Sequence, residues 1–310
     1  MSLFQQQHPI LEQLRRWADC GALRDLDLAL ASFIHQELPD TPASVLLAAA
    51  LVSTHNGQGH VCLNLRQALQ QPDSLLSAAT TIDGEQAMSA QAELASQLSG
   101  LSLSQWLEAL GASPAVHNQL HGQADKHGDT PLVLAGSPQQ PLLYLRRYWR
   151  HEQQIVQAIQ QRLTQPNQLP EAATRTLLDN LFQGQKITAE IGIDWQKIAC
   201  LLAARSNFAI ITGGPGTGKT TTVVRLLALL QGLQLAAKKP LLRIRLAAPT
   251  GKAAARLSES IISSIAKLQL PATQAETVKD SIPKEVTTLH RLLGSKYGSR
   301  KFKHNASNPL

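Results

Sequence analysis

The residues best suited to chemistry form one continuous run: Gly213, Gly214, Pro215, Gly216, Thr217, Gly218, Lys219 and Thr220. The run matches G-x-x-x-x-G-K-[ST], the pattern of loops that wrap the phosphates of a nucleoside triphosphate. Its glycines let the backbone curl and turn N–H groups toward phosphate oxygens, because no Cβ blocks close approach. Lys219 can reach the β- and γ-phosphates, and the Thr220 hydroxyl is a suitable Mg²⁺ ligand. The sequence therefore predicts a nucleotide site.

The segments on either side of this loop indicate a strand and a helix. Residues 208–212 are apolar and β-branched, which predicts a buried strand, and residues 221–231 have helical periodicity. A helix that begins near Gly218 would direct its positive end at the phosphates, and Thr221 would add a hydroxyl there. The alternative is a glycine-rich turn that holds no ligand, and this context argues against it.

A helix is predicted over residues 195–204, with Asp194 as its N-cap. Gln196 lies at its start, where its amide could both donate to and accept from the edge of an adenine. For a single residue, the pattern favours the alternative, a solvent-facing helix glutamine. Base recognition at Gln196 is therefore a hypothesis that needs further support.

A second possible anion site follows a predicted strand at residues 242–248. Pro249 and Thr250 turn the chain into a helix over residues 253–267, with Thr250 as a natural N-cap and Lys252 beside it. The functional interpretation is that this turn binds a phosphate of single-stranded nucleic acid. The alternative is an ordinary capped turn.

Composition excludes several classes of protein. The chain has 310 residues and 43% hydrophobic content, enough for two folded domains. Its longest apolar run, residues 43–52, is too short to cross a bilayer and predicts a core helix, and no secretory signal is expected. Three isolated cysteines argue against a disulfide framework or a zinc site. We expect a cytoplasmic protein with no membrane partner.

Positive charge is concentrated in the C-terminal quarter. Residues 238–310 contain fourteen Lys or Arg and four acidic residues, a net charge of +10, whereas the whole chain carries +7. The remaining residues therefore carry −3. This asymmetry indicates a polyanion partner beside the nucleotide loop, and a solvated basic surface is the alternative.

The chain divides into a helical part and an α/β part. Residues 1 to about 115 are predicted to be helical, and a polar stretch at residues 122–141 suggests a boundary. A strand at 142–145, helices at 146–163 and 172–182, and a short glycine-ended helix at 287–294 follow. We expect two domains, residues 1–139 and 140–310.

Four segments now stand in order: DWQKIACLLAAR, IITGGPGTGKTTTVVRLL, IRLAAPTGKAAARLSESI and TTLHRLLG. Together they resemble the start of the motor domain of the RecD family, the α subunits of bacterial exodeoxyribonuclease V. In superfamily 1 helicases of the 5′-to-3′ class they correspond to the Q motif, motif I, motif Ia and the next DNA-contacting motif. The N-terminal half resembles the family more diffusely, through GHVCL and YLRRYWRHE.

The resemblance implies a helical N-terminal domain that docks onto partner subunits, followed by an incomplete RecA-like phosphate-loop domain with a parallel sheet flanked by helices. It implies an ATP- and Mg²⁺-dependent DNA helicase subunit acting with RecB and RecC on duplex ends and single strands in double-strand break repair. Gln196 would read adenine, residues 213–221 would hold the nucleotide, with Lys219 and Thr220 catalytic, and Pro249, Thr250, Lys252 and His290 would lie along DNA.

The chain departs from the family pattern in one respect. Hydrolysis needs a carboxylate at the end of a neighbouring strand, and none of the four acidic residues after Lys219 follows an apolar strand-like run. By the resemblance, such a strand would follow Leu310, so we expect a fragment that ends before the Walker B motif and is inactive alone. Two alternatives stay open: a stand-alone RecD-like helicase, and a non-catalytic module that binds nucleotide and a partner.

Overall fold

The computed structural model describes residues 8–76, 84–120, 128–184, 192–299 and 301–310. Contacts between residues divide the chain into two compact units, which we call the N-terminal unit (Met1–Val156) and the C-terminal unit (Gln157–Leu310). Helix α7 (Arg146–Leu163) contains the division between them. Over the described residues, no helix is both long and apolar enough to cross a membrane.

The N-terminal unit is a set of helices with a small sheet. Its elements are α1 (Pro9–Asp19), α2 (Asp25–Glu37), α3 (Ala43–Gly57), β1 (Leu63–Asn64), α4 (Leu65–Gln70), the 3₁₀ helix η1 (Pro72–Ser74), α5 (Gly84–Ser99), α6 (Leu103–Ala112), β2 (Val116–Asn118), β3 (Leu132–Gly136), β4 (Pro141–Leu145) and the first part of α7.

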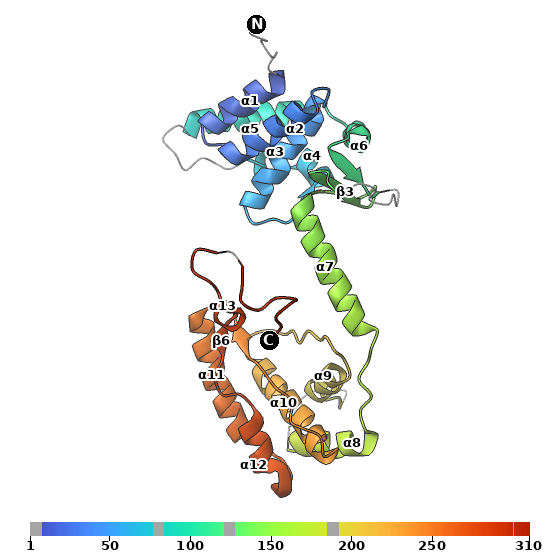
Figure 1. Ribbon diagram of the computed structural model, residues 1–310, viewed down its shortest axis with the longest axis vertical. Coiled ribbons are helices and arrows are strands. Elements are labelled where there is room, and N and C mark those ends of the chain that lie inside the picture. The colour runs from blue at the N-terminus through green and yellow to red at the C-terminus, as the bar shows by residue number, and fades with distance from the viewer. Residues whose placement is uncertain (1–7, 77–83, 121–127, 185–191, 300) are drawn as a thin grey trace. The chain divides into compact units, whose positions relative to one another are not determined.

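Helix α3 lies at the centre of this unit, in contact with α1, α2 and α6 (Figure 1). Its sequence is apolar on every face, and the ten consecutive residues 45–54 are all buried. A helix that is apolar all round must be surrounded by other elements. The core helix predicted for residues 43–52 is therefore confirmed.

The sheet of the N-terminal unit has the order β1-β4-β3-β2, with β4 antiparallel to both neighbours and β3 parallel to β2. Strand β4 confirms the strand predicted at residues 142–145, but β2 and β3 were not anticipated. Because β4 pairs along its whole length with β3, it belongs to the N-terminal unit. The compact units accordingly divide at residues 156/157, later than the expected domain boundary at 139/140.

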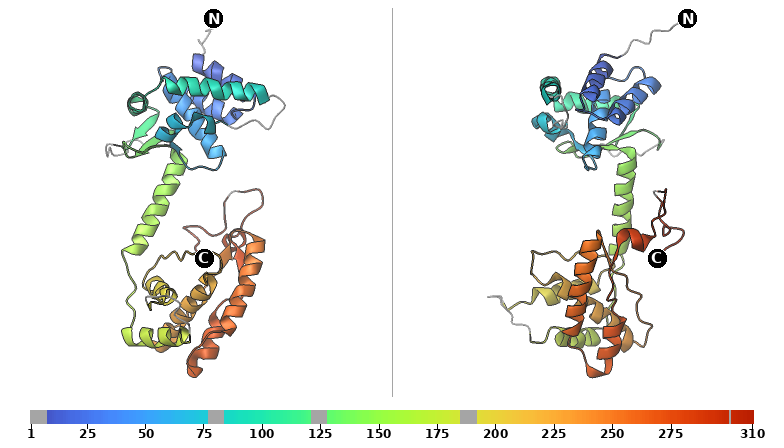
Figure 2. Two further views of the ribbon diagram at one scale, coloured as in Figure 1. Left: turned by 180° about the vertical axis from the view of Figure 1, so that it is seen from behind. Right: turned by 90° about the vertical axis from the view of Figure 1, so that its left-hand side faces the viewer.

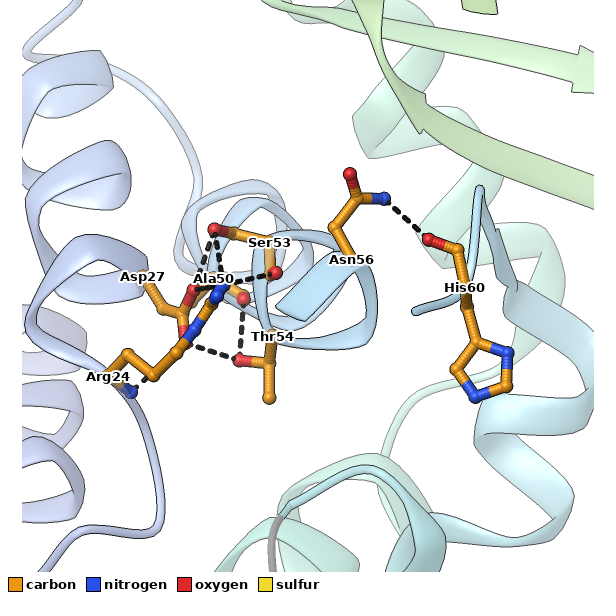
Figure 3. Close-up of polar contacts among 7 residues, drawn as sticks. All are labelled: Arg24, Asp27, Ala50, Ser53, Thr54, Asn56 and His60. Atoms are coloured by element: carbon orange, nitrogen blue, oxygen red, sulfur yellow. Dashed lines mark hydrogen bonds and ion pairs between the residues drawn. The ribbon is translucent and has the colours of Figure 1, made fainter. Parts of the chain in front are cut away.

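A buried carboxylate joins α2 to α3 (Figure 3). Asp27 is fully buried and accepts hydrogen bonds from the Ser53 hydroxyl at 2.6 Å and the Thr54 hydroxyl at 2.9 Å. The Arg24 guanidinium donates to both oxygens of the same carboxylate, at 2.6 and 3.1 Å, and the Arg24 backbone N–H donates at 3.0 Å. One side chain thus satisfies groups from both helices.

The C-terminal unit contains α8 (Glu171–Leu181), α9 (Trp195–Ala204), α10 (Lys219–Ala236), β5 (Ala247–Ala248), α11 (Gly251–Ala266), α12 (Ala272–Ser281), β6 (Thr287–Thr288) and α13 (Leu289–Leu293). Helix α10 is central and contacts α8, α9, α11 and α12, and Figure 2 shows it beside α11 and α12. The helices predicted at 172–182, 195–204 and 253–267 are confirmed within two residues. The helix α12 was not predicted.

Strands are the least predictable part of this unit. Residues 208–212 form no strand, and Ile210 is 79% exposed, so the predicted buried strand is wrong. Of the strand predicted at 242–248, only β5 forms, paired in parallel with β6. A strand is held by hydrogen bonds to a neighbour, and no described residues pair with 208–212. The predicted α/β class, with a parallel sheet among helices, is nevertheless confirmed.

A buried glutamine substitutes for a strand partner at residue 242. The Gln231 amide on α10 donates to the Leu242 carbonyl at 3.0 Å and accepts from the Leu242 N–H at 2.9 Å. Gln231 is itself fully buried, so both of its polar atoms require partners. The segment entering β5 is thereby fixed to α10.

Candidate nucleotide and DNA site

The phosphate loop leads directly into the N-terminus of α10. Gly218 is the N-cap with a φ of 79°, and Gly216 has a φ of 77°, both in the left-handed region that favours glycine. A Cβ on Gly218 would lie 2.7 Å from the Gln196 amide nitrogen, so any other residue would displace that side chain as well as strain the backbone. The first N–H groups of α10 have no partner within the helix and can bind an anion.

The side chains of the loop are organised around its own carbonyl groups. The Lys219 ammonium donates to the Gly213 carbonyl at 2.7 Å and the Gly214 carbonyl at 2.6 Å. The Thr217 hydroxyl donates to Gly214 at 2.9 Å. This arrangement holds a positive charge beside a helix N-terminus, which fits the phosphates of a bound nucleotide.

Gln196, at the start of α9, lies against the end of the loop. Its amide nitrogen donates to the Thr217 carbonyl at 3.0 Å, and Asp194 caps α9 by accepting from the Lys197 N–H, as predicted. The Gln196 amide oxygen accepts a hydrogen bond from Arg225 of α10 at 3.3 Å. The structure therefore brings the predicted base-reading residue to the phosphate loop. Nothing in the sequence pattern singled out Arg225.

Residues predicted for nucleotide and for DNA meet at one cavity. Thr220 at the start of α10 and Thr250, Lys252 and Arg256 at the start of α11 line a cavity of about 520 Å³. Thr250 caps α11 by accepting from the Ala253 N–H at 3.2 Å, so the predicted cap is confirmed. Two helix N-termini and two cations therefore face the same space.

Pro249 and His290 are brought together by the parallel strands. Ala248 pairs with Thr288, so Pro249 and Thr250 follow one strand end while Leu289 and His290 follow its neighbour. The carboxyl ends of adjacent parallel strands lie at the same sheet edge. The His290 ring lies 6.1 Å from the Phe302 ring, adding an aromatic surface to this edge.

Within the part of the chain that the structure describes, no three His, Cys, Asp or Glu side chains cluster as a metal site would require. The Thr220 hydroxyl stays a predicted Mg²⁺ ligand.

Comparison with known proteins divides the chain in a similar way. A family model described as the N-terminal domain of the RecBCD enzyme subunit RecD matches residues 19–144, and a model of an AAA domain matches residues 196–310. The AAA match includes the phosphate loop, both helix N-termini at the cavity, and the β5–β6 pair.

Individual relatives agree with these models. The chain is 35% identical over 269 residues to "RecBCD enzyme subunit RecD" of Haemophilus influenzae, covering 86% of this chain and 38% of the relative. It is 37% identical over 299 residues to the subunit of the same name from Mycolicibacterium smegmatis, covering 96% and 44%. It is also 35% identical over 106 residues to "ATP-dependent RecD2 DNA helicase" of Deinococcus radiodurans, covering 34% and 11%. The chain thus spans less than half the length of these relatives.

Proposed function

We propose, on the premise that the chain belongs to the RecD family, that it supplies the nucleotide site and part of the DNA surface of an ATP-dependent DNA helicase. The full-length subunit would move 5′ to 3′ on single-stranded DNA within a RecBCD exodeoxyribonuclease V, in double-strand break repair and recombination. The observation that carries the proposal is the glycine loop that holds the Lys219 ammonium at the N-terminus of α10.

The residues of the loop would each have a separate task when Mg-ATP binds. The Lys219 ammonium would exchange the Gly213 and Gly214 carbonyls for phosphate oxygens, and the free N–H groups of α10 would bind the same phosphates. Thr220 would ligate the Mg²⁺, while Gln196 would contact the adenine. Bound Mg-ATP supplies the phosphoryl group whose hydrolysis drives movement.

Titration calorimetry of the chain with Mg-ATP tests the nucleotide site. We expect one molecule of ATP to bind per chain, because one loop carries the whole phosphate-binding pattern. A calorimetric trace without binding heat at millimolar Mg-ATP, confirmed by failure to protect the chain against thermal unfolding, would exclude the proposed function.

The DNA surface is proposed to consist of Pro249, Thr250, Lys252 and His290 at the common edge of β5 and β6. Lys252 is exposed at the start of α11, where a phosphate of single-stranded DNA would meet both its charge and the helix N-terminus. The basic C-terminal quarter would attract the same polyanion.

Lys252→Ala is expected to weaken binding of single-stranded DNA and to lower the slope of log affinity against log salt by about 1, the change for one lost phosphate contact. Fluorescence anisotropy at several salt concentrations measures both quantities. Lys267→Ala is the matched control, because Lys267 is also exposed but lies at the other end of α11. Equal slopes for the wild type and Lys252→Ala would remove Lys252 from the DNA surface.

The N-terminal unit is proposed to dock the subunit onto RecC, in a complex that also contains RecB. The matched RecD N-terminal domain lies within this unit. Leu26 and Phe33 on α2 are 64% and 55% exposed, and Leu26 lines a cavity of about 650 Å³ with Arg147 and Arg150. Apolar side chains flanked by arginines suit a protein surface that carries acidic and apolar groups. A cytoplasmic location is part of the same proposal.

Similarity to the RecD2 helicase keeps one alternative open, a helicase that acts without RecB and RecC. Co-elution of the chain with purified RecB and RecC distinguishes the two, since a stand-alone helicase would elute separately. A non-catalytic module is the other alternative. Steady-state ATP turnover of the full-length subunit, with and without single-stranded DNA, separates that module from a motor.

A further inference from the structure

Arg225 occupies an unusual position for a charged residue, on the inner side of the helix that follows the phosphate loop. Its guanidinium carbon lies 4.5 Å from the centre of the Phe182 ring, and Phe182 is buried at the C-terminal end of α8. One guanidinium N–H group donates to the Gln196 amide oxygen at 3.3 Å. Arg225 therefore connects α8, α9 and α10 directly behind the nucleotide loop.

The surroundings of Arg225 restrict its movement. A guanidinium stacked on a ring is held in one plane, which fixes the directions of its N–H groups. Burial lowers the pKa of Arg225 from its ordinary value, and the nearby Asp194 carboxylate partly offsets this effect. Arginine stays charged despite such a shift, so the group remains a donor at every accessible pH.

These contacts determine which way the Gln196 amide faces. Arg225 can only donate, so the atom beside it must be the amide oxygen, and the Thr217 carbonyl can only accept, so the atom beside it must be the amide nitrogen. A glutamine between a pure donor and a pure acceptor cannot rotate by 180° without losing both bonds. Arg225 and Thr217 thus both favour the same order of donor and acceptor at Gln196.

We infer that Arg225 is a positioning residue for base selection, which fixes the Gln196 amide in the one orientation that complements adenine. This inference rests on the proposed nucleotide function. Adenine presents a donor, its amino group, next to an acceptor, N7, whereas guanine presents two acceptors there. An amide with one donor and one acceptor in fixed order matches adenine at both atoms and guanine at one. Without Arg225 the amide would lose one of the contacts that fix its orientation, so it would adopt the matching orientation less often.

The test measures dissociation constants for ATP and GTP by competition with a fluorescent ATP analogue on the full chain. We expect Arg225→Ala to weaken ATP binding about 10-fold and GTP binding less than about 2-fold, as for one or two hydrogen bonds. Arg225→Lys should recover only part of the preference, because an ammonium lacks the planar fork. Phe182→Leu, which keeps an apolar side chain but removes the ring, should reduce the preference as well.

A double variant separates positioning from a general effect on folding. If Arg225 acts through Gln196, then Gln196→Ala lowers the ATP preference by a similar factor, and adding Arg225→Ala causes no further loss. Equal weakening of ATP and GTP by Arg225→Ala, or additive losses in the double variant, would overturn the inference while leaving the nucleotide site intact. If the wild-type chain bound neither nucleotide, the proposed function itself would fail.

Discussion

Lys219→Ala is expected to reduce the affinity of the chain for Mg-ATP by about 100-fold, the largest effect of any single substitution in the loop. A lysine that bonds to phosphate contributes a charge-assisted contact worth about 2 to 3 kcal/mol, and each 1.4 kcal/mol is a factor of ten. In the structure the ammonium is already held beside the helix N-terminus by two carbonyl groups. Binding therefore requires exchange of partners rather than ordering of a free side chain. Titration calorimetry measures the change.

The matched control is Lys239→Ala, since Lys239 is an exposed lysine just beyond the C-terminal end of α10. It should bind ATP as the wild type does. In the full-length subunit we expect Lys219→Ala to abolish ATP-driven translocation. Unchanged unwinding from the 5′ strand by that variant, with the partner subunits present, would contradict the assignment of the loop as the motor site.

Asp27→Ala is expected to destabilise the N-terminal unit by about 3 kcal/mol. The substitution removes the acceptor of the Ser53 and Thr54 hydroxyls and of the Arg24 guanidinium, and breaking a buried ion pair on one side costs about 3 to 5 kcal/mol. The low end of that range applies because the Arg24 side chain is partly exposed. Urea unfolding of the chain, followed by far-UV circular dichroism, measures the loss. Asp25→Ala, an exposed acidic residue in the same turn, should change stability little.

The same carboxylate gives the N-terminal unit a defined response to acid. Burial alone would raise the pKa of Asp27, but hydrogen bonds from Arg24, Ser53 and Thr54 outweigh burial and lower the pKa below its ordinary value of 3.8. A depressed pKa in the folded state stabilises the protein above the unfolded value. This contribution is fully present above about pH 4 and is lost as the pH falls through the folded pKa. Asp27→Ala should therefore unfold with a shallower dependence on pH below 4 than the wild type.

The features that local chemistry controls could be predicted from the sequence. Asp194 and Thr250 cap their helices because a side-chain oxygen can accept from an N–H group three residues later. Gly294 ends α13 in the left-handed conformation that glycine tolerates best. The buried helix α3 follows from an apolar run without a polar face. Each of these outcomes depends on residues within one or two helical turns.

The features that depend on distant partners could not be predicted. Residues 208–212 have the composition of a strand, but composition does not supply the neighbouring strand that holds one. The strands β2 and β3 lie in or beside a polar stretch that indicated a boundary, and they form because β3 pairs with β4. Arg225 belongs to an apolar helical run, and only the packing of α8 against α10 reveals its stack on Phe182. The boundary at 139/140 and the roles of the site residues stay predictions.

The two hydrogen bonds between Gln231 and Leu242 link α10 to the segment that leads into β5. Eighteen residues of continuous helix form a stiff rod of roughly 27 Å. The first residue of α10 belongs to the phosphate loop. Near the other end of the helix, Gln231 forms hydrogen bonds with the backbone that leads into the Thr250 turn. Because these hydrogen bonds join the helix to that segment, any axial shift of α10 would move Leu242 with it. A displacement at the phosphate loop would then be transmitted through the protein interior to the segment that leads into the Thr250 turn.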